Sequence, residues 1–127
     1  MTLLDRARAL GQHPVLAALP AAVRIALAER ARPVDLVAGA VVAVSAEQLL
    51  LVLTGEVTLG SRRAGPGALL GLGDALADRR VALAPEVTAA GAALRLPRDA
   101  TLDLVSDHPA AVAALLALVA AMARAEA

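Results

Sequence analysis

The most informative feature of this 127-residue sequence is the set of residue types that it lacks. It has no Cys, which excludes disulfides, thiolate nucleophiles and metal sites built on Cys. All twelve basic side chains are Arg, so chemistry that needs Lys, such as Schiff bases and Walker-type phosphate loops, is excluded. Phe, Tyr and Trp are also absent, which removes base-stacking platforms and cation–π cages. We therefore expect a protein that is not an enzyme.

Charge and apolar content indicate a globular protein without a nucleic-acid or membrane partner. Twelve Arg balance twelve Asp and Glu, and a net charge of zero gives no attraction to phosphate backbones. The apolar fraction, 59%, is too high for a disordered chain. The uncharged run 109–123 is shorter than the ~20 residues of a membrane helix. Charges within residues 1–8 exclude the apolar stretch of a signal peptide, so we expect a cytoplasmic protein.

The N-terminal third carries helix signals. Thr2 and Asp5 form an acidic variant of the capping box, followed by helix-like apolar spacing that ends at Gly11. Residues 15–19 form an apolar segment that we expect to be irregular. Pro20 then starts a second helix, predicted over residues 21–31.

The middle of the sequence predicts short strands separated by turns. The continuous apolar run 49–53 is consistent with a strand that is buried on both faces. We expect a turn at residues 54–56, a hairpin tip at 60–63, and a tight turn opening a short helix at 71–76. Further strands are predicted at residues 34–38, 41–44, 57–59, 81–84, 86–89 and 92–96.

Helices, then many short strands, then helices indicate an α+β fold. The frequent turn signals favour an antiparallel β-roll, similar to a jelly roll, over an open sheet. We expect a single domain over residues 1–127, with N-terminal helices in 1–32, the β-roll in 33–97 and C-terminal helices in 98–127.

Six short motifs occur in an order that a known family shares. They are 15–20 (VLAALP), 37–42 (VAGAVV), 51–57 (LVLTGEV), 65–71 (GPGALLG), 94–99 (LRLPRD) and His108-Pro109. Together they resemble the cyclic-nucleotide-binding domain family, found in Crp-like regulators, protein kinase regulatory subunits and gated channels. The resemblance covers residues 3–123 and implies a Crp-like sensor domain without a DNA-binding domain.

The resemblance also implies where a ligand would bind. In the family, a short helix N-terminus and an Arg hold the cyclic phosphate, and a Glu accepts a hydrogen bond from the ribose. Leu72 stands in the place of that Glu and cannot accept a hydrogen bond, whereas Asp74 substitutes for it if the turn is shifted. Arg80 falls in the Arg-x-Ala signature of the family. If the site is retained, the ligand-binding residues are Gly71, Leu72, Gly73, Asp74, Arg80, Val81 and Ala82.

These residues also have a purely structural explanation. Gly71 and Gly73 suit a tight turn, and Arg79 and Arg80 suit a solvated turn paired with Asp74 or with Asp78. The segment between Gly71 and Arg80 is shorter than is usual in the family. We therefore predict a degenerate phosphate-binding cassette, with cyclic AMP or cyclic GMP as the only candidate ligands.

The last predicted helix, 109–125, is apolar on all sides, and Asp99 is expected to cap a shorter helix, 100–106, before it. The apolar back is either an Ala-rich surface that is poorly hydrated or a surface covered by another subunit. Crp-like proteins dimerise through the helix at this position, as the resemblance implies. The residues expected at an oligomer interface are Val112, Leu115, Leu116, Leu118, Val119 and Met122.

His13 and His108 each precede Pro, and no further ligands stand at a spacing typical of metal sites, so neither a metal site nor catalytic residues are predicted. We predict a non-enzymatic module that resembles cyclic-nucleotide-binding domains and acts through protein–protein interaction or assembly. Its partner is a second copy, or it is a subunit of a larger assembly. The alternative is a genuine cyclic AMP- or cyclic GMP-sensing domain that signals through its C-terminal helix.

Overall fold

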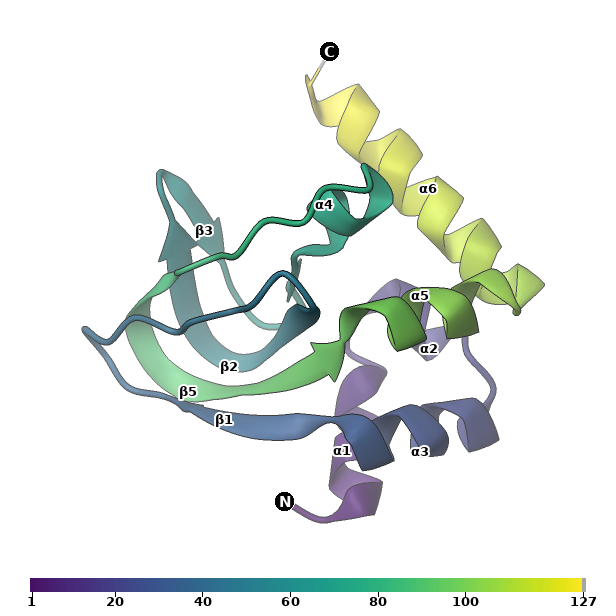
Figure 1. The fold of residues 1–127 in the computed structure, drawn as a ribbon, viewed down its shortest axis with the longest axis horizontal. Helices are drawn as coiled ribbons and strands as arrows, with labels where there is room; N and C mark the ends of the chain where they lie inside the picture. Colours follow the sequence, from purple (N-terminus) through teal and green to yellow (C-terminus); the bar gives the residue numbers. More distant parts are fainter. Residues whose placement is uncertain (127) are drawn as a thin grey trace.

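The computed structural model describes residues 1–126 and confirms an α+β fold in which most of the helices gather at one side of an antiparallel sheet (Figure 1). The chain opens with helices α1 (Leu3–Leu10), α2 (Pro14–Ala17) and α3 (Ala21–Arg30). The middle holds strands β1 (Arg32–Leu36), β2 (Gln48–Leu59), β3 (Arg62–Ala64) and β4 (Leu69–Leu70), helix α4 (Leu72–Leu76) and strand β5 (Glu86–Pro97). Helices α5 (Arg98–Ser106) and α6 (Pro109–Glu126) close the described chain.

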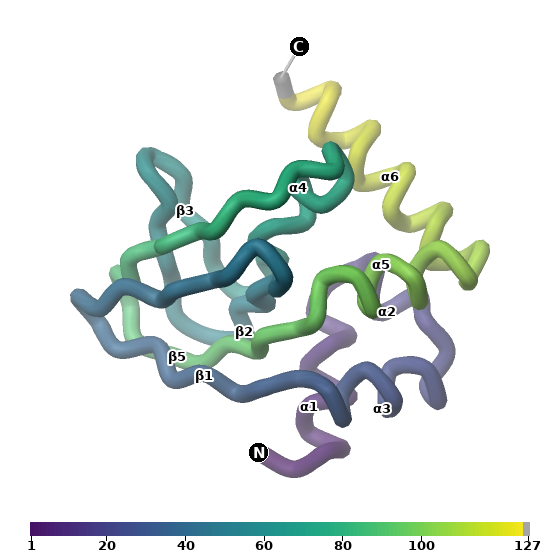
Figure 2. Tube along the Cα trace, viewed as in Figure 1, coloured from purple at the N-terminus to yellow at the C-terminus, as the bar shows by residue number. Residues whose placement is uncertain are grey.

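The strand order of the antiparallel sheet is β1-β5-β2-β3, and β4 pairs with the start of β2. β2 and β5 form its centre and pair from Gln48 opposite Pro97 to Thr58 opposite Glu86. Both strands curve strongly along their length, as the trace in Figure 2 shows, so the sheet is rolled. The register between them shifts between Val52 and Val57, and such bulges bend a strand pair.

Two glycines make this bend possible. Gly55 in β2 has a φ of +83°, and a Cβ there would lie 2.5 Å from the carbonyl oxygen of Ala89. A Cβ on Gly91 in β5 would overlap the Thr54 carbonyl. The predicted turn at residues 54–56 is therefore wrong, because β2 continues through it as a bulge. For the same reason the strands predicted at 86–89 and 92–96 are one strand, β5.

The strands predicted at 41–44 and 81–84 are also wrong, because these segments meet only at isolated bridges. Val41 pairs with Glu86 and Val44 pairs with Leu83. Pro85 lies between the two bridges and has no N–H with which to continue a ladder.

Two helix starts differ from the sequence prediction. Residues 14–17 are helical, not irregular, because the Nδ1 atom of His13 accepts a hydrogen bond from the Val15 N–H and Pro14 suits the first helical position. Helix α5 begins at Arg98, so Asp99 lies inside its first turn and does not cap it. The predicted capping box of Thr2 and Asp5 is confirmed.

The core is aliphatic and lies on both faces of β2. Leu49, Leu51 and Leu53 pack with the helices, where Leu10, Leu16 and Leu27 are fully buried. Leu50, Val52 and Val57 point into the roll and pack with Leu36 and Val87. The prediction of a strand buried on both faces at residues 49–53 is confirmed.

Within the described residues, no single helix is long and apolar enough to cross a membrane. α5 and α6 reach that length and hydropathy only as a pair, with a bend of 108° between them.

Candidate functional site

A cleft of about 810 Å³ lies between the β3–β4 region of the roll, helix α4 and the second half of α6. This volume is within the range of small-molecule sites, which is about 300–1,000 Å³. The turn at residues 65–68 forms part of its wall, and Leu118, Val119 and Met122 of α6 face it from the other side.

Helix α4 places four of the predicted ligand residues at the cleft. Gly71 adopts the left-handed conformation, with a φ of +93°, directly before the helix. A Cβ there would lie 3.1 Å from Cδ2 of Leu49, so the turn packs closely against β2. Leu72, Gly73 and Asp74 follow and line the cleft. Leu72 is buried in its wall, where its side chain offers only hydrocarbon to a ligand.

The other three predicted ligand residues, Arg80, Val81 and Ala82, do not line the cleft. The Nη1 atom of Arg80 donates hydrogen bonds to both carboxylate oxygens of Glu47, at 2.8 and 2.7 Å, and Nη2 donates to Asp99 at 3.3 Å. The hydrogen bonds to Glu47, followed by those to Asp99, raise the pKa of Arg80. The guanidinium is thus already bound to two carboxylates, away from the cleft.

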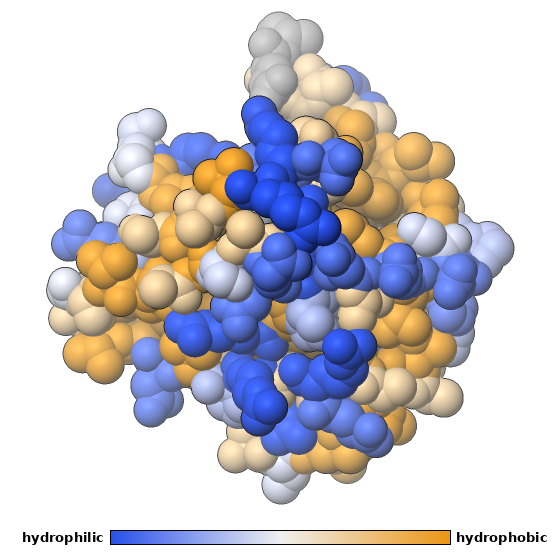
Figure 3. Space-filling view, viewed as in Figure 1, coloured by the Kyte–Doolittle hydropathy of each residue, from blue (hydrophilic) through white to orange (hydrophobic). Residues whose placement is uncertain are grey.

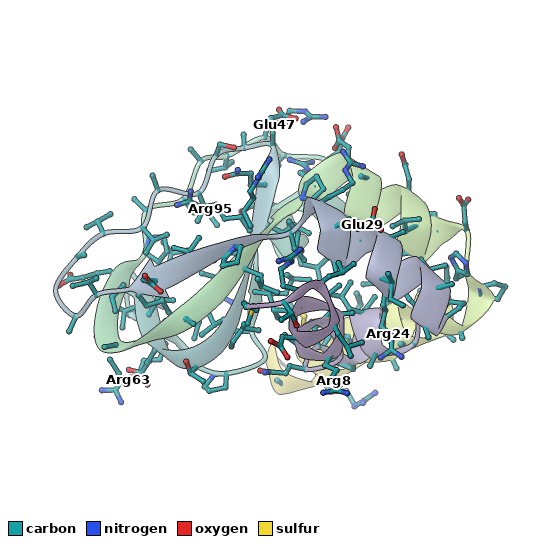
Figure 4. The ribbon with its side chains drawn as sticks, turned by 90° about the horizontal axis from the view of Figure 1, so that it is seen from below. Arg8, Arg24, Glu29, Glu47, Arg63 and Arg95 are labelled. Carbon is teal, nitrogen blue, oxygen red and sulfur yellow. The ribbon has the colours of Figure 1, made fainter. Side chains whose placement is uncertain are left out.

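Glu47, the partner of Arg80, lies apart from Arg63 of the cleft lining. Figure 3 shows a hydrophilic band down the middle of one face, between apolar areas over the sheet and over α6. Figure 4 shows Glu47 and Arg63 projecting from opposite sides of the molecule. Arg63 lies on β3 and lines the cleft.

Arg79 is the arginine of this segment that lines the cleft. Its Nη2 atom lies 3.2 Å from Oδ1 of Asp74, in one of the two pairings that the sequence left open for this turn. This ion pair involves Oδ1 of Asp74, which is the one carboxylate among the described lining residues.

Sequence reasoning missed the roles of four polar residues in this region. His13 and the Arg62-Arg63 pair line the cleft, although the sequence favoured loop packing for the former and plain exposure for the latter. Arg98 is 4% exposed and donates hydrogen bonds to the carbonyl oxygens of Ala46 and Arg79, at 3.3 and 2.7 Å. It ties two loops to α5. No sequence signal distinguishes it, because its partners are backbone atoms of distant segments.

Helix α6 has two halves with different surroundings. In the first half, Ala111 is fully buried, and Ala114, Leu115 and Leu118 pack against the core. From residue 119 to residue 125 every position is exposed. The predicted interface residues are divided accordingly. Leu115 and Leu118 face inward and Val112 is half-buried, whereas Leu116, Val119 and Met122 are 64, 43 and 48% exposed.

Metal chemistry finds no support in the described residues. Nowhere in residues 1–126 do three His, Asp or Glu side chains gather closely enough to hold a metal ion.

No protein-family model matches this chain, and no curated protein is significantly similar to it in sequence. Solved structures do match. The sensor domain of the transcriptional regulator DNR from Pseudomonas aeruginosa is 19% identical, with a TM-score of 0.79 over 95% of this chain and 88% of that chain. The regulatory domain of Toxoplasma gondii PKA, crystallised with cAMP, is 16% identical, with a TM-score of 0.67 over 94% of this chain and 50% of that chain.

A third match is the regulatory subunit of a cAMP-independent protein kinase A from Trypanosoma brucei. It is 21% identical, with a TM-score of 0.62 over 83% of this chain and 44% of that chain. The chain thus spans about half the length of both kinase proteins. These likenesses agree with the order of the six sequence motifs and with the rolled sheet that the closing helices cover. The chain therefore has the fold of the cyclic-nucleotide-binding domains.

Proposed function

We propose that this chain is a non-enzymatic regulatory module that acts through protein–protein contact on α6, with a second copy of the same chain as its partner. The observation that carries the proposal is the exposed apolar surface in the middle and second half of α6. We define this surface as the α6 patch, which consists of Ala113, Leu116, Val119, Ala120, Met122 and Ala123. Contiguous apolar patches on a soluble surface typically mark interaction sites.

The geometry of the α6 patch suits a second helix. Leu116 lies at its centre, and the small side chains of Ala113, Ala120 and Ala123 stand three, four and seven residues from it on the same face. Small residues around one large residue let two helices approach closely. A two-fold pairing brings the same patch of both copies together, and this is the commonest symmetry of soluble oligomers.

The surroundings of the cleft support a function without cyclic nucleotide. Arg80 is bound to Glu47 and Asp99, and Leu72 offers no hydrogen-bond acceptor. A ribose hydroxyl buried against hydrocarbon loses its hydrogen bond to water without replacement, which costs about 1–3 kcal/mol. The structural neighbours are described as sensor or regulatory parts of larger proteins, and one is described as cAMP-independent. The sensor and regulatory descriptions support a regulatory role over a catalytic one, and the description as cAMP-independent supports a function without cyclic AMP.

The test compares self-association of the wild type, of Leu116→Glu and of the control Val37→Glu by light scattering at micromolar concentration. Val37 is also exposed and apolar, at 62%, but lies in the loop after β1. We expect a dimer for the wild type and for Val37→Glu. Leu116→Glu should be a monomer, because a buried unpaired carboxylate is costly. A monomeric wild type, or dimers in all three proteins, contradicts the proposal.

The alternative, a cyclic-nucleotide sensor that signals through α6, is favoured by one observation. The cleft lies beside Gly71 and is bounded by α6, so a ligand there would contact the closing helix. Calorimetric titration with cyclic AMP and cyclic GMP decides between the two functions. Saturable heat that disappears in Arg79→Ala, which removes the arginine of this segment that lines the cleft, would establish the alternative.

A further inference from the structure

We propose that the cleft binds a small amphipathic anion that has a hydrocarbon body and a single carboxylate. The carboxylate would bind to the polar lining residues His13, Arg62 and Arg63, and the hydrocarbon would lie between α4 and α6. This ligand class goes beyond the function proposed above, and its binding is measured separately from self-association.

The apolar walls of the cleft favour a ligand with a hydrocarbon body. Only five of its 22 lining residues carry polar side chains, and none of them is Ser, Thr, Asn or Gln. The remaining wall is formed largely by aliphatic side chains such as Leu69, Leu72 and Leu118. A ligand rich in hydroxyls would leave its polar groups unpaired there, whereas hydrocarbon is stabilised when its apolar surface leaves water.

The charged residues of the cleft favour a ligand with a negative charge. The lining residues include three arginines, Arg62, Arg63 and Arg79, and one carboxylate, Asp74. With His13 neutral, the lining therefore has a net charge of +2. The Arg79 guanidinium is paired with Asp74. Arg62 and Arg63 have no carboxylate within 4.0 Å in the described part of the chain. Two unpaired guanidinium groups beside an apolar cavity fit a carboxylate, to which an Arg can donate two parallel hydrogen bonds.

His13 provides a buried hydrogen-bond donor at the same site. Its side chain is 6% exposed, and burial lowers its pKa, so the imidazole is neutral near pH 7. Because Nδ1 accepts the hydrogen bond of the Val15 N–H at 3.2 Å, the proton of the neutral ring is on Nε2. Nε2 has no acceptor among the described residues and is not enclosed by protein. Its N–H is therefore available to a carboxylate oxygen in the cleft.

The turn at residues 65–67 connects these polar groups along the wall of the cleft. It directly follows β3, which carries Arg62 and Arg63, and it packs against the chain next to His13. A Cβ on Gly67 would lie 3.2 Å from the carbonyl oxygen of Gln12. The hydrocarbon would lie along α6, where Val119 and Met122 are half-exposed. A bound ligand covers both side chains and thereby stabilises the second half of this helix.

The test is calorimetric titration of the full chain with dodecanoate below its micelle concentration. We expect saturable binding of one dodecanoate per chain. Dodecyltrimethylammonium, which has the same hydrocarbon and the opposite charge, should bind at least tenfold more weakly. The double variant Arg62→Ala/Arg63→Ala should weaken dodecanoate binding at least fivefold. Arg8→Ala/Arg30→Ala, which removes two exposed guanidinium groups elsewhere, should leave it unchanged.

A second measurement follows the two imidazoles by NMR. Dodecanoate should shift the ring resonances of His13 and leave those of His108, which does not line the cleft, in place. No saturable binding, equal binding of the cation, equal weakening by both double variants, or tighter binding of cyclic AMP overturns the inference. Light scattering reports on self-association independently, so failure of one proposal is distinguishable from failure of the other.

Discussion

Arg79 and Arg80 are neighbours in sequence, but their side chains have different partners. Arg79 pairs with Asp74 at the cleft, and Arg80 pairs with Glu47 and Asp99 on another face. Exposed pairs of this kind contribute little to stability, because solvent screens them and long side chains lose entropy on pairing. Their importance here is positional, since they decide which guanidinium groups remain available to a ligand.

His13 yields a prediction about pH. Burial lowers its pKa below the ordinary value of 6.5, so the unfolded chain binds more protons than the folded protein as the pH falls through 6.5. Stability should therefore decrease from pH 7.5 to pH 5.5 and level off once the pH is below the folded-state pKa. In His13→Asn this contribution should disappear, while the Asn oxygen still accepts the Val15 N–H at the helix start.

Urea unfolding of both proteins at the two pH values measures the effect. The same loss of unfolding free energy in His13→Asn as in the wild type would rule out His13 as its source.

Among the helices and strands, β2 and β5 show how local signals and tertiary structure compete. Gly55 and Gly91 carry turn signals, yet both lie inside long strands. The strands approach so closely at the bend that neither position has room for a Cβ. A glycine that permits a turn and a glycine that permits a bulge look identical in one sequence, because the difference lies in what packs against it.

Because the strands approach closely at the bend, adding one methyl group there should strongly lower the stability of the protein. Gly91→Ala should destabilise the protein by roughly 2 kcal/mol or more, because its Cβ meets the rigid backbone of Thr54 and Gly55. Gly65→Ala is the matched control, since a Cβ there has no atom within 4 Å and its φ is not positive. The control should change stability by less than about 0.5 kcal/mol. Equal unfolding free energies for the two variants in urea would contradict this account of the bend.

At the scale of the whole molecule, two parts of α6 have different roles. One part stabilises the fold, and the other is exposed and available for association. Its first half completes the core through Ala111, Ala114, Leu115 and Leu118. Its second half is exposed and contributes to the cleft and to the α6 patch. The same helix thus connects the two proposals, since Val119 and Met122 belong to both surfaces.

This division predicts the outcome of a truncation. A chain that ends at Val119 should keep its unfolding free energy to within about 1 kcal/mol, because the removed residues that the structure describes are exposed. It should no longer self-associate, because half of the α6 patch is gone. Leu118→Ala is the contrasting variant, since it removes a core contact and should destabilise the fold. Thermal unfolding and light scattering measure the two properties separately, and a large loss of stability on truncation would contradict the division.

Local patterning was sufficient for much of this protein. Capping residues and apolar periodicity located α1, α3 and α6, because helix signals lie within a few residues of one another. The uninterrupted run at residues 49–53 identified the buried central strand, and the order of the motifs identified the fold. Gly71 to Asp74 were correctly expected beside one another on a short helix.

Contacts between distant segments decided the rest. The pairing of Arg80 with Glu47, 33 positions earlier in the chain, and the burial of Arg98 under two loops depend on how the roll closes. The convergence of His13, Arg62 and Arg63 on one cleft depends on the turn at residues 65–67 packing against Gln12. Such partners have no fixed sequence separation, so no local pattern encodes them. The absence of aromatics, Cys and Lys limited the possible chemistry, and the tertiary structure determined which of the remaining side chains are available for it.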